Sequence, residues 1–410
     1  MFQSPVLQLL FSTTFLLLLL SSLIFLKPNY TPSPAAILSS VLFDRYPGTP
    51  KTEAEAKIQW IKPPVDFFGL DVDMADSILP MIGSRTWFNL YPHPTKTGPK
   101  PLRQWIKRLN WLKKNSTDPS ILRALSIPKA KLEADGYVTY PEGVPIGNGE
   151  EGACNWERTG CLVDEEHGYK NNLDIVHAEN GTWVVNFDDG PLPPSKTLYD
   201  ALDQFNAKAT HFWIGGNVLK NWRLALMAAK RGDHLAVHTW SHAHLTTLSD
   251  NEVLGELGWC IQIIADVTGK VPKYFRPPYG NIDNRIRVIA KHVFGLETVI
   301  WNYDSVDWGL NQTYATGDLV DTPDPATAPS YQAVVDGIKI IAANGPGYDP
   351  KKTASVNRQS NQAGCLILEH ELSEESVSAF KDSWEFVKSQ GWKMVPLPEG
   401  LPGGDGDWYQ

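Results

Sequence analysis

The sequence has little cysteine and no excess of positive charge. Its 410 residues include four Cys, and 37 Lys plus Arg stand against 46 Asp plus Glu, a formal net charge of −9. This balance argues against binding to nucleic acid, because proteins that bind phosphate backbones usually carry a basic excess. An apolar fraction of 42% and a charged fraction of 20% also exclude wholesale disorder and a polytopic membrane protein. The length suits one large α/β domain with extensions, or two to three domains.

The N-terminal segment lacks charge altogether. No charged side chain occurs between Phe2 and Leu26, and Leu16–Leu20 is an unbroken run of leucine. Such a stretch is typical of a targeting or membrane segment. Because Lys and Arg are missing ahead of it, residues 1–35 fit either a cleaved signal peptide with its linker or an uncleaved signal anchor. Both predict that the rest of the chain lies outside the cytosol, either secreted or attached to a membrane only through this segment.

The four cysteines permit three disulfide pairings in an oxidising compartment. The favoured bridge joins Cys154 to Cys161, because seven residues in a Gly-rich, turn-like stretch let the two side chains meet. Cys260 falls in a helical pattern and is expected to be an ordinary buried thiol. Four Asn-x-Ser/Thr sequons, which are compatible with a secretory route, begin at Asn29, Asn115, Asn180 and Asn311.

Residues 36–150 are expected to form an N-terminal extension. Residues 27–100 are irregular and punctuated by proline, so we interpret them as linker and surface wrapping. The apolar residues between Leu102 and Leu112 recur at helical spacing, with basic residues on the other faces. This pattern predicts a helix that docks by one face on the main domain. A helix that binds a membrane surface or a partner is the alternative.

From residue 183 onward, short β-rich runs alternate with helical ones. Helices are predicted for Lys196–Ala207, for Leu219–Arg231 ending before Gly232, and for Ser249–Thr268 with a Ser249/Glu252 capping box. This alternation implies right-handed crossovers and a parallel sheet. No Gly-rich dinucleotide turn follows the first strand, so an α/β barrel is favoured over a doubly wound sheet. The seven predicted strands are Trp183–Phe187, Ala209–Ile214, His234–His238, Lys273–Arg276, Glu297–Trp301, Cys365–Glu369 and Lys393–Val395.

Polar clusters follow these strands, at the end of a barrel where active sites form. Asp188 and Asp189 are adjacent carboxylates that repel each other unless a cation or a buried base role separates them. His238 and His242 can supply two imidazole nitrogens, and one Asp completes a three-ligand set of the kind found at catalytic zinc sites. Two histidines satisfied by local hydrogen bonds are the structural alternative.

The same strand ends also supply candidates for an acid and a base. The aspartate that does not bind metal could stay ionised beside Arg276 and accept a proton from water. His370 is the candidate acid, and Asp307 could hold its imidazole in the protonated form. The structural alternatives are a surface ion pair for Arg276 and a helix cap for Asp307.

These motifs resemble those of the polysaccharide deacetylase family, the NodB-homology domain of carbohydrate esterase family 4, and most closely fungal chitin deacetylases. The resemblance covers about residues 150 to 396, so a catalytic domain is expected over 151–400, with a Gly-rich tail over 401–410. Five motifs carry it in order: Asn186–Pro191, His238–His242, Arg276–Tyr279, Asp304–Trp308 and Leu368–His370. Asn186 departs from the family pattern, which often has Thr, Ser or Tyr just before the aspartate pair.

The resemblance implies an α/β fold that is a distorted (β/α)7 barrel, preceded by the irregular and helical extension. It implies that Asp188 is the general base and that Asp189, His238 and His242 bind a divalent ion, Zn²⁺ or Co²⁺. It further implies that Arg276 steadies the base.

On the acid and substrate side, the resemblance implies that Asp307 tunes His370 as the acid. The backbone N–H of Tyr279 would bind the oxyanion. Trp308 and Leu368 would line a pocket for the acetyl methyl group.

The activity implied is hydrolysis of the acetamide of N-acetylglucosamine units in chitin, which yields chitosan and acetate. The same machinery in related proteins deacetylates peptidoglycan or xylan, and the motifs do not separate these polymers. A protein of another class, a non-catalytic glycan-binding or cell-wall relative on the same fold, is a further alternative. It is disfavoured because the acid, the base and all three ligands are present.

Overall fold

The computed structural model describes residues 82–147, 152–163, 174–310, 328–344, 364–403 and 407–410. The chain divides into two compact units, residues 1–45 and 46–410, and every described residue belongs to the second. The predicted targeting segment, and the sequons at Asn29 and Asn311, lie outside the described residues. Asn115 and Asn180 are both exposed. Of the helices that are described, none has the length and apolarity needed to cross a membrane.

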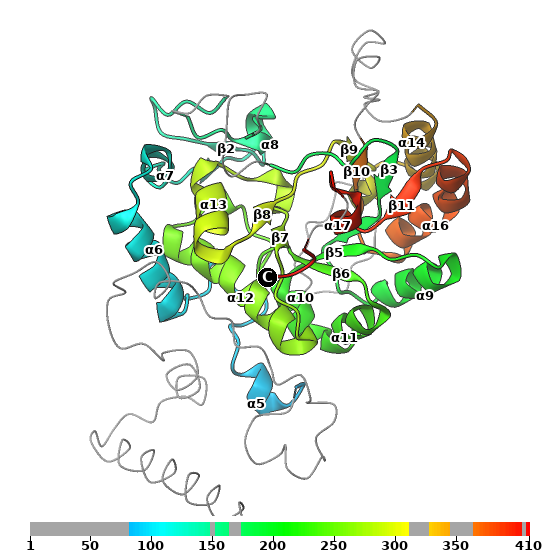
Figure 1. Ribbon diagram of the computed structural model, residues 1–410, viewed down its shortest axis with the longest axis horizontal. Helices are drawn as coiled ribbons and strands as arrows, with labels where there is room; N and C mark the ends of the chain where they lie inside the picture. Colours follow the sequence, from blue (N-terminus) through cyan, green and yellow to red (C-terminus); the bar gives the residue numbers. More distant parts are fainter. Residues whose placement is uncertain (1–81, 148–151, 164–173, 311–327, 345–363, 404–406) are drawn as a thin grey trace, which may run out of the picture. The chain divides into compact units, whose positions relative to one another are not determined.

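A barrel of short parallel strands forms the centre of the second unit (Figure 1). Each of the seven predicted strands is present. The first is split into two at Val185, the fifth is shortened to Glu297–Thr298, and a further short strand that was not predicted, Tyr303–Asp304, follows it. The strands are β3 (Thr182–Val184), β4 (Asn186–Asp188), β5 (Thr210–Trp213), β6 (His234–Val237), β7 (Tyr274–Phe275), β8 (Glu297–Thr298), β9 (Tyr303–Asp304), β10 (Cys365–Leu368) and β11 (Lys393–Val395).

The strands form two parallel sheets that meet to close the barrel. One sheet has the order β4-β5-β6-β7-β8, and the other has the order β11-β3-β10-β9. On one side β3 continues into β4, and a parallel bridge joins Asp188 of β4 to His370, which follows β10. On the other side β8 leads into β9. All of the strand pairings are parallel. The predicted distorted barrel is confirmed.

The barrel is filled by side chains from successive strands. Every residue of β3, β4, β5 and β6 is buried, as expected for parallel strands that have helices outside and a core inside. One contiguous core cluster collects a residue from or next to each strand around the ring. Its members include Val184, Phe212, Ala236, Tyr274, Val299 and Leu366. The interior is therefore packed, and only the strand ends can provide a site.

Helices surround the strands (Figure 1). α12 begins with the predicted capping box of Ser249 and Glu252 and ends at Gly269, whose φ of 73° favours glycine. The predicted helix Leu219–Arg231 is instead two helices, with a break at Asn221. The helices of the barrel region are α9 (Ser195–Phe205), α10 (Gly215–Lys220), α11 (Trp222–Arg231), α12 (Asp250–Thr268), α13 (Asn284–Val288), α14 (Tyr331–Asn344), α16 (Glu374–Ser389) and α17 (Leu397–Gly400).

Shorter turns connect these elements. Three are 3₁₀ turns: η1 (Leu245–Thr247), η2 (Pro278–Gly280) and η4 (Asp307–Gly309). A π-helical turn, η3 (Ile289–Val293), continues α13.

The described part of the N-terminal extension packs on the barrel helices. It contains α5 (Arg85–Phe88), α6 (Arg103–Asn115), α7 (Pro119–Ala124), and the hairpin β1 (Lys131–Leu132) and β2 (Val138–Thr139); α8 (Trp156–Thr159) follows the extension. α6 docks by one face, as predicted. Its Trp105 is fully buried and contacts the ring of Trp259 in α12, with ring centroids 5.4 Å apart.

The predicted bridge between Cys154 and Cys161 is formed, and it closes a loop around α8. Cys260 is a buried free thiol, as expected, and Cys365 is also buried and free.

Candidate active site

The chemistry-bearing side chains meet at one end of the barrel because each follows a parallel strand. Asp188 ends β4, His238 follows β6, Arg276 follows β7 and His370 follows β10. The backbone joins two of these strand ends, since the N–H of Asp188 donates to the carbonyl of Glu369 at 2.9 Å. The carboxyl ends of parallel strands share one edge, so residues far apart in the sequence become neighbours.

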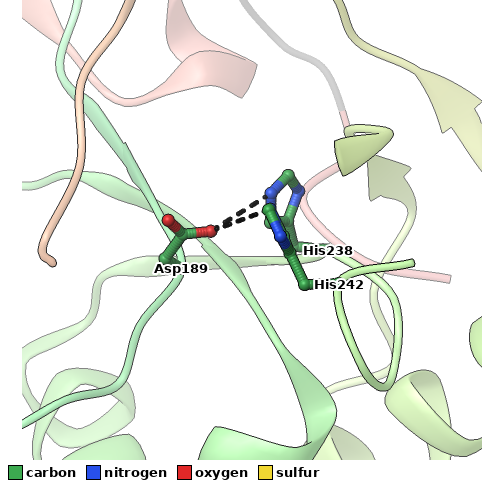
Figure 2. Close-up of side chains that lie close together, drawn as sticks. All are labelled: Asp189, His238 and His242. Carbon is green, nitrogen blue, oxygen red and sulfur yellow. Dashed lines mark ion pairs between the residues drawn. The ribbon is translucent and has the colours of Figure 1, made fainter. Parts of the chain in front are cut away.

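Asp189, His238 and His242 form a compact cluster of possible metal ligands (Figure 2). The Asp189 Oδ1 atom lies 3.4 Å from Nε2 of His238 and 3.3 Å from Nε2 of His242. One ligand atom from each residue lies within 4.8 Å of the others. One carboxylate oxygen and two imidazole nitrogens are the donor set of many catalytic zinc sites.

The electrostatics of Asp189 fit a cation at this point. Its Oδ1 atom is buried and has no hydrogen-bond partner among the residues that the structure describes. Burial alone would raise the pKa of Asp189, but the nearby His242 and His238 outweigh burial and hold the pKa below its usual value. An ionised, buried and unsatisfied oxygen is costly unless a positive charge meets it. The three residues could therefore hold a metal ion.

The orientation of His238 is fixed by the backbone. Its Nδ1 atom lies 2.8 Å from the carbonyl oxygen of Arg276, a group that can only accept a hydrogen bond. Nδ1 therefore carries the proton, and the lone pair of His238 is on Nε2, which faces Asp189. Metal-binding histidines are commonly oriented in this way.

Asp188 is paired with a buried arginine on one flank of the cluster. The Nη1 atom of Arg276 donates to Oδ1 of Asp188 at 2.7 Å, and the Asp188 side chain is almost entirely buried. The guanidinium of Arg276 also packs on the ring of Phe212, 4.2 Å from the ring centroid. The Asp188 carboxylate is therefore buried, charge-paired and held in a defined position.

His370 is paired with a buried aspartate. Both carboxylate oxygens of Asp307 contact His370. Oδ1 lies 2.7 Å from Nδ1 of His370, and Oδ2 accepts the His370 backbone N–H at 2.8 Å. Burial alone would lower the pKa of His370, but the charge and hydrogen bond of Asp307 outweigh burial and raise it to about 10. The imidazole is therefore protonated at neutral pH, as a general acid must be.

The three predicted substrate-binding residues lie at different depths. Leu368 ends β10 and is 6% exposed, whereas Trp308 in η4 is 43% exposed, with its Nε1 atom 3.2 Å from Oδ1 of Asp304. Tyr279 lies in η2, and its ring contacts that of His242, with centroids 4.6 Å apart. Their roles toward a substrate stay predictions.

The backbone of the site loops is unusual. In the described part of the chain, seven residues other than glycine have positive φ, and five of them belong to these loops: Asp189, Thr239, His242, Tyr279 and Val306. Left-handed backbone at such residues costs about 1–3 kcal/mol each and persists only where surrounding contacts enforce it. The clustering of this strain marks the same region that the side chains do.

Comparison with known proteins agrees with these motifs. Residues 176–298 match the family model described as polysaccharide deacetylase. Over these residues the chain is similar to polysaccharide deacetylases. The resemblance drawn from its motifs is thereby confirmed.

Among curated proteins similar to this chain, chitin deacetylase 3 of Cryptococcus neoformans is 36% identical over 315 residues, which cover 75% of this chain and 65% of the relative. Chitin deacetylase of Amylomyces rouxii is 31% identical over 239 residues, which cover 58% of this chain and 54% of the relative. The chain thus spans less than two thirds of the length of these relatives.

Solved structures also resemble part of this chain. The chitin deacetylase of Colletotrichum lindemuthianum has a TM-score of 0.45 and 22% identity. The match covers 58% of this chain and 96% of the Colletotrichum chain. A family 4 carbohydrate esterase of Streptomyces lividans has a TM-score of 0.40 and 28% identity. The match covers 53% of this chain and 93% of the Streptomyces chain.

Several residues that hold the loops of the site in place were not recognised from the sequence. The side-chain amide of Asn217 donates to the carbonyl of Asp189 at 2.8 Å, and that of Asn221 donates to the carbonyl of Pro191 at 2.9 Å. Asn186, the residue that differs from the family motif, donates its side-chain amide to the carbonyls of Val184 and Ile367, which ties the first strand to β10. Polar residues within otherwise apolar runs were the available signal.

Glu256 is the most heavily engaged of the missed residues. From the buried face of α12, its carboxylate accepts the backbone N–H groups of Trp240 and Ser241, both at 2.9 Å, and the Ser241 hydroxyl at 2.7 Å. Ser241 and Trp240 lie in the sequence between His238 and His242. Glu256 thus holds the backbone that carries both candidate histidine ligands.

The N-terminal extension completes this arrangement. The N–H of Gly98 donates to Glu256 at 2.8 Å, and the carbonyl of His93 accepts the indole N–H of Trp240 at 3.0 Å. Residues 27–100 were interpreted from the sequence as linker and surface wrapping. Residues 93–98 do more than this. This segment contacts the loop that carries His238 and His242.

Proposed function

We propose that the chain is a metal-dependent deacetylase that hydrolyses the N-acetyl groups of N-acetylglucosamine units in chitin. The observation that carries this proposal is a single cluster of Asp189, His238 and His242 beside an arginine-paired aspartate and an aspartate-paired histidine. A site with two imidazoles, an anionic base and a cationic acid suits hydrolysis of an unreactive amide. The products would be acetate and a glucosamine unit within chitosan.

Asp188 and His370, on either side of the candidate metal ligands, would transfer the protons of the reaction. Asp188, kept ionised by Arg276, would accept a proton from the attacking water. His370, kept protonated by Asp307, would donate a proton to the departing amine nitrogen. The backbone N–H of Tyr279 would donate to the oxygen that gains negative charge.

The remaining residues hold the reacting groups. Asp189, His238 and His242 would bind Zn²⁺ or Co²⁺, which supplies positive charge that polarises the amide and makes water easier to deprotonate. Trp308 and Leu368 would contact the acetyl methyl group.

Chitin is favoured over other acetylated polymers because the curated relatives are named chitin deacetylases. Peptidoglycan or xylan would use the same groups and remains the alternative within the enzyme class. A non-catalytic glycan-binding protein would not require so costly a buried carboxylate pair. Secretion or attachment to the cell wall would bring the enzyme to such a polymer, with a membrane anchor in the N-terminal segment as the alternative.

The test is acetate release. Purified protein is incubated with chitin oligomers, peptidoglycan fragments or acetylated xylan, after chelation and after restoration of Zn²⁺ or Co²⁺. The proposal expects release from chitin oligomers that stops with the chelator and returns with the metal. Preference for another polymer would overturn the chitin assignment. Release that ignores the chelator, or none from any glycan with metal present, would overturn the hydrolase.

A further inference from the structure

We infer that the hydroxyl group of Tyr279 positions His242 for metal binding, in addition to any role of the Tyr279 backbone. This inference rests on the proposed function, because it assumes that His242 is a metal ligand. The Tyr279 Oη atom lies 3.0 Å from Nδ1 of His242. On the opposite edge of the same ring, Nε2 of His242 faces Asp189 at 3.3 Å.

The direction of the hydrogen bond follows from the chemistry of the ring. A neutral imidazole has one N–H and one lone pair, and a metal takes the lone pair. With Nε2 directed at the metal position, the proton must be on Nδ1. Nδ1–H then donates to the Tyr279 oxygen, which accepts. Such a contact fixes both the tautomer and the ring orientation of a ligand histidine.

The two histidine ligands differ in how they are oriented. His238 donates to the main-chain carbonyl of Arg276, a group that no side-chain substitution removes. For His242 the corresponding contact is to a side chain. The backbone of His242 is itself left-handed, with a φ of 59°. The contact that orients His242 can therefore be tested by removing a single atom, the Tyr279 hydroxyl oxygen.

Tyr279 is held in place by a second imidazole. The ring of His244 stacks on the ring of Tyr279, with centroids 4.0 Å apart and planes inclined by 12°. Nε2 of His244 lies 3.7 Å from Oε1 of Glu157, whose other oxygen accepts the Asn281 side-chain amide at 2.6 Å. The Tyr279 ring is thus packed between His242 and His244, and its hydroxyl has a defined position.

The disulfide-closed loop supports the same turn from outside. Glu157 belongs to α8, which lies between Cys154 and Cys161. A Cβ atom placed on Gly280 would lie 2.2 Å from the ring of Trp156, so this glycine is required for the loop to pack there. A short chain of contacts therefore runs from the disulfide loop through Glu157, His244 and Tyr279 to a metal ligand.

Replacement of Tyr279 by phenylalanine separates the two roles of the residue. Tyr279→Phe keeps the backbone N–H and the ring that stacks on His244, and it removes only the oxygen that accepts from His242. Tyr331→Phe is the matched control, because Tyr331 donates its hydroxyl proton to Asp382 at 2.7 Å on the surface of α14 and α16. Both variants and the wild type are stripped of metal and titrated with Zn²⁺ against a competing chelator.

The expected result is a rise in the Zn²⁺ dissociation constant of about 10- to 100-fold for Tyr279→Phe and no change for Tyr331→Phe. Equal affinity in wild type and Tyr279→Phe would overturn the inference and leave the proposed function intact. Absence of Zn²⁺ binding by wild type would instead overturn the proposed function, and the inference with it.

A measurement on the wild type covers the case in which Tyr279→Phe does not fold. Nitrogen-15 NMR of the histidine side chains reports which ring nitrogen carries the proton in the Zn²⁺-loaded protein. The inference expects His242 to be protonated on Nδ1 and bound through Nε2. Binding through Nδ1 would overturn it.

Discussion

Asp188 and His370 each depend on a buried partner of opposite charge. Arg276 pairs with Asp188 at 2.7 Å, and Asp307 pairs with His370 at 2.7 Å. The partners differ in kind: a guanidinium donates to the Asp188 carboxylate, whereas a carboxylate contacts the His370 imidazole and raises its pKa. The proposed division into a base and an acid follows from these different partners.

Substitution of Asp188 and His242 separates base from ligand. Asp188→Asn keeps the shape of the side chain but cannot accept a proton, so we expect turnover to fall by about 10²- to 10⁴-fold with metal content near normal. His242→Ala removes an imidazole and should lose both metal and turnover. Acetate release and metal analysis of both purified variants give the comparison. Equal metal loss in the two would show that the aspartate roles are exchanged.

Asp307→Asn tests the electrostatic origin of the acid. Asp307 contributes most to the raised pKa of His370, with smaller contributions from Asp189 and Asp188, so loss of the Asp307 charge should lower that pKa. The acid form is present below the pKa and lost above it, so the alkaline limb of kcat/KM should move to lower pH in the variant. The measurement is a pH profile of acetate release for wild type and variant. An unchanged alkaline limb would mean that His370 is not the acid.

At the scale of elements, α12 does more than cover the barrel. Its Glu256 carboxylate receives four donors: two backbone N–H groups of the histidine loop, the Ser241 hydroxyl and the N–H of Gly98. Burial raises the pKa of Glu256, but four donors on two oxygens is the arrangement that an ionised carboxylate requires. The helix and the N-terminal extension thus converge on one group beneath the metal cluster.

Glu256→Gln should weaken both the fold and the metal cluster. The new amide nitrogen would face donors, so we expect a loss of about 1–3 kcal/mol in the free energy of unfolding and a higher Zn²⁺ dissociation constant. Glu385→Gln, on the exposed face of α16, is the matched control. Urea unfolding and Zn²⁺ titration give the two readouts. If both variants behaved alike, the carboxylate would not hold the loop.

The strand ends could be predicted from sequence because their signals are local. A buried β-rich run followed by Asp188 and Asp189, or by His238 and His242, shows both the strand and the edge at which its polar residues gather. The break at Asn221 could not be predicted in this way. Its cause is a hydrogen bond to the carbonyl of Pro191, 30 residues away, and the run from Leu219 to Arg231 fits one helix.

The same reasoning explains why the role of residues 93–98 was missed. Gly98 and His93 act through backbone N–H and carbonyl groups, which every residue possesses, so their side chains carry no signal. Glu256 did carry one, as a carboxylate within a run of buried residues. Its partners belong to a loop 15 residues earlier and to the extension, and only the packed structure brings them together.

At the scale of the whole molecule, a buried network of charges ties the strands to the site. Nδ1 of His211 in β5 lies 2.9 Å from Oε1 of Glu371, the residue after His370, and its Nε2 lies 3.7 Å from Oδ2 of Asp233. Arg231 donates to Asp233 at 2.9 Å. A Cβ atom on Gly190 would lie 2.0 Å from Glu371, so this network packs directly beneath the Asp188–Asp189 turn.

We expect this network to make the free energy of unfolding depend on the charge of His211. Burial alone would lower the pKa of His211, but Glu371 and Asp233 outweigh burial and raise it to about 9, above its ordinary value of 6.5. A folded-state pKa raised above the unfolded one contributes stability that is full below about pH 6.5 and is lost as the pH rises through 9. We therefore expect the free energy of unfolding to fall across this interval in urea titrations of the wild type.

His211→Gln removes the titrating group from the network. The variant should be less stable at pH 6, because Glu371 loses its cation and Asp233 keeps only Arg231, and its stability should change less between pH 6.5 and 9. Urea unfolding of both proteins at a series of pH values provides the comparison. If wild type and variant lost stability equally over this range, another group would be responsible, and the buried histidine would be neutral in the folded protein.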